Sequence, residues 1–196
     1  MIFKGTATAL ITPFTEDDKV DVQAIRNIVD MQIANGINAL VALGTTGEPA
    51  TLSEEEKEQI VRVCVEQTSG KIPLIVGAGS NSTRQAVETC RMAQKLGADA
   101  LLVVTPYYNK CTQEGLVEHY GAIAEATSLP IICYNVASRT GVNILPETFA
   151  RIATEHKNVV AIKEASGNME QIEQCLRLFP DMVTSAAHFP SVPILP

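Results

Sequence analysis

The chain contains 196 residues, of which 46% are apolar and 19% are charged, and its formal net charge is −7. This composition is typical of a globular protein with one sizeable core, and the acidic balance argues against a nucleic-acid partner, which would need a basic face. No apolar run approaches the roughly 18 residues needed to cross a membrane. The first residues, MIFKGTATAL, lack the pattern of a signal peptide, so we expect a cytoplasmic protein.

Short apolar runs alternate with amphipathic segments along most of the chain. The apolar runs predict six strands, and a less regular run at 181–187 is the candidate for a seventh. The six runs lie within residues 5–14, 34–48, 72–80, 95–109, 129–135 and 159–166.

Helix start signals precede the amphipathic segments. Ser53 and Glu56 have the spacing of a capping box, and Asn168 and Gln171 repeat it before the last helix. Pro146 suits the first turn of a helix. Three further helices are expected after Asp21, Ser82 and Thr112.

Continuous apolar strands that alternate with helices predict a parallel sheet with covered faces, in the α/β class. Many polar residues follow the strands directly, and in a (β/α)8 TIM barrel such strand ends converge on one face. We therefore expect a single barrel domain over residues 1–196. A complete barrel typically needs about 250 residues, so the barrel is expected to be incomplete at its C-terminus, with an atypical proline-containing tail at 183–196.

The chain shows none of the usual cofactor motifs. The segment GAGSNST lacks the third glycine of a dinucleotide-binding loop and the lysine of a P-loop, so it predicts a tight strand-to-helix turn. Five scattered cysteines suit reduced, mostly buried thiols. The three histidines form no ligand pair, and no metal site is expected.

Lys163 interrupts an apolar strand in the segment VVAIKEASGN. Burial lowers the pKa of a lysine and raises the share of neutral amine, which is the nucleophile that forms a Schiff base with a keto substrate. The alternative is a structural lysine that pairs with Glu164 or extends its ammonium group to water.

Other strand ends carry residues suited to the same chemistry. The loop GTTGE (44–48) offers the hydroxyls of Thr45 and Thr46 between Gly44 and Gly47, and such a loop can bind a carboxylate. Tyrosines are competent acid–base groups when they are hydrogen-bonded, and an arginine can bind a carboxylate through two bonds. The tyrosines are Tyr107, Tyr108 and Tyr134, and the arginine is Arg139. Packing, helix capping and a solvated surface arginine remain the structural alternatives.

Four motifs in this order, GTTGE, TPYYNK, YNVASRTG and AIKEASGN, resemble the dihydrodipicolinate synthase family. These pyruvate-dependent class I aldolases also include N-acetylneuraminate lyase. The resemblance extends from residue 1 to about residue 182. It implies a TIM barrel that condenses pyruvate with L-aspartate 4-semialdehyde to 4-hydroxy-tetrahydrodipicolinate, in lysine and diaminopimelate biosynthesis, without a metal or organic cofactor.

The resemblance also implies a role for each site residue. Lys163 would form the imine with pyruvate, and a hydroxyl relay of Thr45, Tyr134 and Tyr108 would move protons. Thr46 would hold the carboxylate of pyruvate, and Arg139 that of the semialdehyde. The family commonly forms homotetramers, so a homo-oligomer is expected, a dimer or tetramer with Tyr107 and Tyr108 at the subunit contact and Tyr108 acting in the neighbouring site.

The chain departs from the family pattern in three places. Ala137 and Cys111 stand where prolines are usual, and the segment after Asp181 does not continue the family's seventh strand end. Two alternatives therefore stay open beside the synthase. One is a non-catalytic, shortened remnant that retains only assembly surfaces, and the other is a different pyruvate aldolase such as N-acetylneuraminate lyase.

Overall fold

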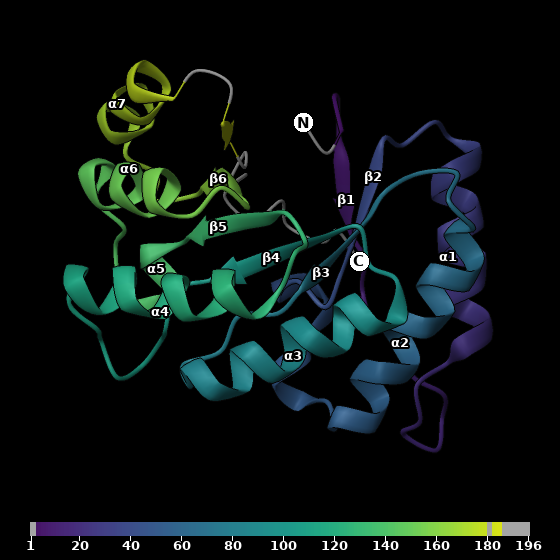
Figure 1. Cartoon of the computed structure of the whole chain (residues 1–196). Helices are drawn as coiled ribbons and strands as arrows, with labels where there is room; N and C mark the ends of the chain where they lie inside the picture. The colour runs from purple at the N-terminus through teal and green to yellow at the C-terminus, as the bar shows by residue number, and fades with distance from the viewer. Residues whose placement is uncertain (1–2, 180–181, 186–196) are drawn as a thin grey trace.

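The computed structural model describes residues 3–179 and 182–185 of the chain (Figure 1). Seven parallel strands form one sheet, and each strand pairs with the next one along the chain. The strands are β1 (Ala7–Ala9), β2 (Ala39–Ala42), β3 (Leu74–Gly77), β4 (Ala100–Val104), β5 (Ile131–Asn135), β6 (Val159–Glu164) and β7 (Val183–Ser185). This order is that of a (β/α) barrel that has not closed, as the sequence predicts.

Helices connect the strands and cover the outer face of the curved sheet (Figure 1). The α-helices are α1 (Val22–Ala34), α2 (Glu54–Thr68), α3 (Thr83–Leu96), α4 (Gln113–Ala126), α5 (Ala137–Thr140), α6 (Pro146–Glu155) and α7 (Met169–Leu178). Two short 3-10 turns, η1 (Thr45–Gly47) and η2 (Pro49–Thr51), follow β2.

Residues alternate along each strand between two buried layers. Leu40, Leu74 and Leu101 belong to the layer between sheet and helices, whereas Ala39, Ile75, Ala100, Leu102, Ile132 and Tyr134 pack together in a second cluster on the inner face. Because both faces of the sheet are covered, its strands are continuously apolar in sequence. The continuous apolar runs in the sequence are therefore explained by packing on both faces of the sheet.

The predicted helix starts are confirmed in all but one detail. Ser53 accepts a hydrogen bond from the backbone of Glu56, whose carboxylate accepts one from the Ser53 N–H, as a capping box requires. Asn168 caps α7, but the second half of the box expected there is wrong. The Gln171 side chain binds Glu164 and Asn143 instead, and Ser166 accepts the bond from the Asn168 N–H.

The candidate seventh strand is confirmed as β7, which pairs with β6. The rest of the atypical tail, residues 186–196, lies outside the described residues, and a single domain over the whole chain stays a prediction. No described helix is both long and apolar enough to span a membrane. All five cysteines are free, and all but Cys111 are buried.

Candidate active site

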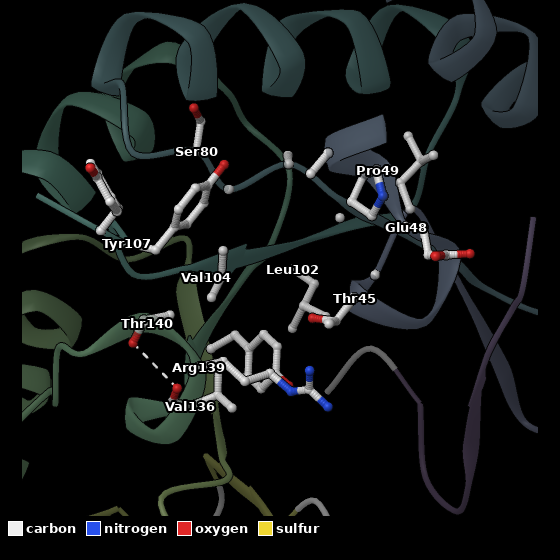
Figure 2. A pocket seen from close by; sticks show the side chains of 18 of the residues that line it. Thr45, Glu48, Pro49, Ser80, Leu102, Val104, Tyr107, Val136, Arg139 and Thr140 are labelled. Atoms are coloured by element: carbon white, nitrogen blue, oxygen red, sulfur yellow. Dashed lines mark hydrogen bonds between the residues drawn. The ribbon is translucent and has the colours of Figure 1, made fainter. Parts of the chain in front are cut away.

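A cavity of about 920 Å³ opens at the carboxyl ends of β2 to β5. Of the predicted site residues, Gly44, Thr45, Tyr107, Tyr108, Tyr134 and Arg139 border it, whereas Thr46, Gly47 and Lys163 are not among its lining residues. Figure 2 shows Thr45, Tyr107 and Arg139 around the same space, each from a different strand end. The predicted convergence of polar strand ends is therefore present.

Lys163 is linked to this cavity through Tyr134. The two residues are paired in register on β6 and β5, so their side chains share the inner face of the sheet. The Lys163 Nζ lies 4.3 Å from the centroid of the Tyr134 ring, and the tyrosine side chain borders the cavity. Lys163 therefore lies beneath the cavity wall that Tyr134 forms.

Burial lowers the pKa of Lys163 below its ordinary value. The cause is removal of the ammonium group from water, which favours the neutral amine. The alternative ion pair with Glu164 does not occur, because successive residues of a strand point to opposite faces. Glu164 is fully buried behind the sheet.

The GTTGE loop leaves β2 through strained backbone. Leu43 and Glu48 both have left-handed conformations, with φ of 55° and 51°, and Thr12 fixes the loop by donating a 2.7 Å hydrogen bond to the Gly47 carbonyl. The Gly47 N–H donates to Gly44 within the loop. Thr45, Thr46 and Glu48 are the exposed residues of the loop, and the two threonines offer hydroxyl groups to a ligand.

Two glycines, one in β3 and one in the turn after it, explain how closely the backbone on either side of β3 lies. A Cβ on Gly77 would be 2.0 Å from the Leu43 carbonyl oxygen, and a Cβ on Gly79 would be 2.5 Å from the Val104 amide nitrogen. Only glycine permits backbones to approach this closely. The predicted tight turn GAGSNST is confirmed, and its glycines seat neighbouring strand ends against β3.

Arg139 extends from the short helix α5, directly after β5, and its side chain is exposed. It forms no ion pair within residues 3–179 and 182–185, so its guanidinium is available for a carboxylate. Thr140 anchors the helix by donating to the carbonyl of Val142 at 2.9 Å.

The paired tyrosines after β4 differ in their surroundings. Tyr107 is half-buried at the cavity, whereas Tyr108 is 90% exposed and has left-handed backbone with φ of 72°. No hydrogen bond between described residues joins the hydroxyls of Tyr108, Tyr134 and Thr45, so the relay is not assembled within this chain. The described residues also contain no cluster of three or more metal-ligating side chains.

Sequence reasoning missed a buried polar group behind Lys163. Glu164 and Asn135 are both 0% exposed and hydrogen-bonded to each other, and Gln171 joins them. The signal was present in the strand alternation, because a carboxylate next to an inward-facing lysine has to enter the layer under the helices.

Known proteins with similar sequences and structures agree with the resemblance that the four motifs indicate. Residues 2–185 match the dihydrodipicolinate synthetase family. The 4-hydroxy-tetrahydrodipicolinate synthases of Geotalea daltonii and Geobacter sulfurreducens are 53% and 52% identical over 182 residues, which is 93% of this chain and 62% of each relative. The crystal structure of dihydrodipicolinate synthase from Thermotoga maritima superposes with a TM-score of 0.90 at 50% identity, and 95% of this chain covers 64% of that one.

The chain thus spans about 62% of the length of the curated relatives that it matches. Its incomplete barrel corresponds to part of a complete one in the solved structures, with a TM-score of 0.91 to another dihydrodipicolinate synthase at 44% identity. Motifs, strand order and superposition agree, and the chain belongs to the dihydrodipicolinate synthetase family.

Proposed function

We propose that the site condenses pyruvate with L-aspartate 4-semialdehyde through a Schiff base on Lys163. The observation that carries this proposal is the half-buried lysine stacked on Tyr134, whose side chain borders the cavity. An amine with a lowered pKa at a strand end of a barrel suits imine formation with a keto acid. The names of the matched relatives support the same reaction.

The chemistry proceeds in three steps. The neutral Nζ of Lys163 adds to the C2 carbonyl of pyruvate, and loss of water gives an imine. Loss of a proton from C3 gives an enamine, whose C3 forms a carbon–carbon bond with the aldehyde carbon of the semialdehyde. The amino group of that substrate then adds to C2 and displaces Nζ, which closes the ring and releases the lysine.

Five predicted residues besides Lys163 would have a role in these steps. Tyr134, whose ring contacts Lys163, would exchange protons with the imine, with Thr45 and Tyr108 as its relay partners. Thr46 would bind the carboxylate of pyruvate, and the guanidinium of Arg139 would bind that of the semialdehyde. The chain's own side chains supply the nucleophile and the acid–base groups, and the proposal includes no cofactor.

Borohydride trapping tests the covalent step. Incubation with pyruvate and sodium borohydride should add a stable adduct to Lys163, located by peptide mass spectrometry, and Lys163→Met should abolish it. Lys110→Met is the matched control, because Lys110 also borders the cavity and its loss should leave the adduct. Absence of an adduct in the folded protein, or an adduct that survives in Lys163→Met, would contradict the proposal.

The second substrate is tested separately. With semialdehyde present, Arg139→Ala should raise the KM for the semialdehyde by about 10²-fold, since a two-bond arginine–carboxylate contact is lost, and leave the trapping of pyruvate unchanged. A panel of other aldehydes distinguishes the synthase from an N-acetylneuraminate lyase. A protein that binds neither substrate would fit the non-catalytic alternative.

We further propose a cytoplasmic homo-oligomer in which Tyr107 and Tyr108 lie at the subunit contact. The 90% exposed ring of Tyr108, held at the cavity rim by left-handed backbone, supports this arrangement. Light scattering after size-exclusion chromatography measures the oligomer, and Tyr108→Ser should weaken it. An unchanged mass at all concentrations would exclude a contact that depends on this ring.

A further inference from the structure

Glu164 is the last residue of β6 and follows Lys163 directly. Its side chain is 0% exposed, although a carboxylate is costly to bury. No arginine, lysine or histidine forms an ion pair with it in the described part of the chain. Its buried charge therefore depends on hydrogen bonds from uncharged groups.

Three groups donate these hydrogen bonds. The side-chain amide of Asn135 lies 3.1 and 2.9 Å from the two carboxylate oxygens. The Gln171 side chain donates at 2.9 Å, and the backbone N–H of Ser166 donates at 2.7 Å. Both oxygens are thus occupied, and hydrogen bonds to a charged acceptor are among the stronger ones in proteins.

The orientation of each amide is fixed by its other partner. The Asn135 Oδ1 accepts a bond from the Ile144 N–H, so its nitrogen has to face Glu164. The Gln171 Oε1 accepts from the Asn143 side chain, so its nitrogen faces the carboxylate as well. A group at position 164 that donated a proton would break this arrangement, whereas two acceptor oxygens complete it.

The network connects the segments that carry the site residues. Asn135 follows Tyr134 at the end of β5, and Glu164 follows Lys163 at the end of β6. Asn143 and Ile144 belong to the loop after α5, the helix that carries Arg139. The carboxylate therefore joins the two strand ends, and the amides of Asn135 and Gln171 extend the network to this loop, on the face of the sheet opposite the cavity.

We propose that Glu164 is a positioning residue, which sets the distance between Lys163 and Tyr134 and the place of the Arg139 loop from behind the sheet. The inference rests on the proposed function for its consequence in catalysis, but the network itself is independent of that function. Glu164 touches no reacting atom. It acts through the backbone of β6 and through Asn135.

Glu164→Gln tests the proposal, because it keeps the shape of the side chain but places an NH2 group where an acceptor is needed. The two strand ends should separate, and the rate of pyruvate trapping on Lys163 at saturating pyruvate should fall by about tenfold or more, since small displacements of reacting groups are costly. Gln171→Met is a milder second variant. It leaves the carboxylate in place, removes one donor, and should give a smaller loss in the same direction.

Asn158→Ala is the matched control. Asn158 precedes the other end of β6 and donates bonds of 2.9 and 3.0 Å to the carbonyls of Ala124 and Thr127. Its loss also leaves part-buried polar groups without partners, so it should lower the melting temperature while the trapping rate stays within twofold of the wild type. Equal slowing in Asn158→Ala and Glu164→Gln would reduce Glu164 to a general stability role and overturn the proposal.

A second measurement needs no pyruvate and separates the two proposals. Acetic anhydride labels amines, and mass spectrometry gives the labelling rate of Lys163 relative to exposed Lys71. This ratio should rise about threefold or more in Glu164→Gln and in Gln171→Met, and stay unchanged in Asn158→Ala. If the wild type traps no pyruvate but the labelling ratio rises in Glu164→Gln, the proposed function fails and the positioning role stands. A labelling ratio that is the same in Glu164→Gln and the wild type overturns the positioning role.

Discussion

Replacing Gly77 by alanine would place a methyl group where the backbone after the neighbouring strand β2 already lies. The new Cβ would be 2.0 Å from the Leu43 carbonyl oxygen, 2.5 Å from its carbonyl carbon and 3.0 Å from the Gly44 nitrogen. Leu43 is itself buried and in left-handed conformation. The obstacle is backbone next to the GTTGE loop, so it cannot turn aside as a side chain would.

The magnitude follows from the size of the movement. Contacts to a Cβ shorter than 3.0 Å essentially do not occur, so the Leu43 carbonyl has to move by about 1 Å or the strands have to separate. Overpacking of this kind costs about 3 kcal/mol. The entropic gain of about 0.5–1 kcal/mol from replacing a glycine within a strand offsets part of it. We expect a net loss of about 2 kcal/mol in the free energy of unfolding.

Urea unfolding measures this loss, and pyruvate trapping on Lys163 measures the effect on the site. Displacement of the loop that carries Thr45 should slow trapping by about tenfold. Gly70→Ala is the control, because Gly70 has φ of 71° and nothing within 4 Å of an added Cβ. It should cost about 1 kcal/mol from backbone strain alone and leave trapping unchanged. If the Gly77 variant is as stable as the control and traps pyruvate normally, the close approach does not position the loop.

Two further predictions concern buried titratable groups. Burial lowers the pKa of Lys163, so the unfolded chain binds the proton more tightly than the folded one, and the lysine lowers the stability of the fold at pH 7. Lys163→Met should therefore raise the free energy of unfolding at pH 7, by an amount that shrinks as the pH approaches 10.5. A gain that grows with pH would contradict this. Burial also lowers the pKa of His119 to about 4, so wild-type stability should fall between pH 6.5 and pH 4, and His119→Phe should remove up to about 3 kcal/mol of that fall. Urea titrations across this range measure it, and equal slopes in both proteins would refute it.

Local sequence patterns were sufficient for most of the fold. The six strands, the caps at Ser53 and Asn168 and the proline at the start of α6 were predicted correctly, because each depends on residues within a few positions of one another. The failure at Gln171 has a long-range cause. Its partners Asn143 and Glu164 are 28 and 7 residues away in sequence, and a capping rule that considers one turn of helix cannot include them.

In the site, too, local patterns could be predicted from the sequence and long-range contacts could not. Lys163 was identified because a lysine in an apolar strand is locally anomalous, and the structure places it against Tyr134, 29 residues earlier in the chain. The close approach at Gly77 and the strained backbone of Leu43 follow from how β2 and β3 stack, and no single segment encodes them. The role expected for Tyr108 rests on the family resemblance alone, and within the described residues its ring is 90% exposed.

The strand β6 shows how a short segment can serve both faces of a sheet. Alternation directs Lys163 to the inner face, where chemistry needs a reactive amine, and Glu164 to the outer layer, where neutral donors hold its charge. A salt bridge between the two would raise the pKa of the lysine and remove the neutral amine. Because the carboxylate lies behind the sheet, the two charges are separated, while the shared backbone still couples their positions. The position of the amine is thereby fixed without an ion pair that would keep it protonated.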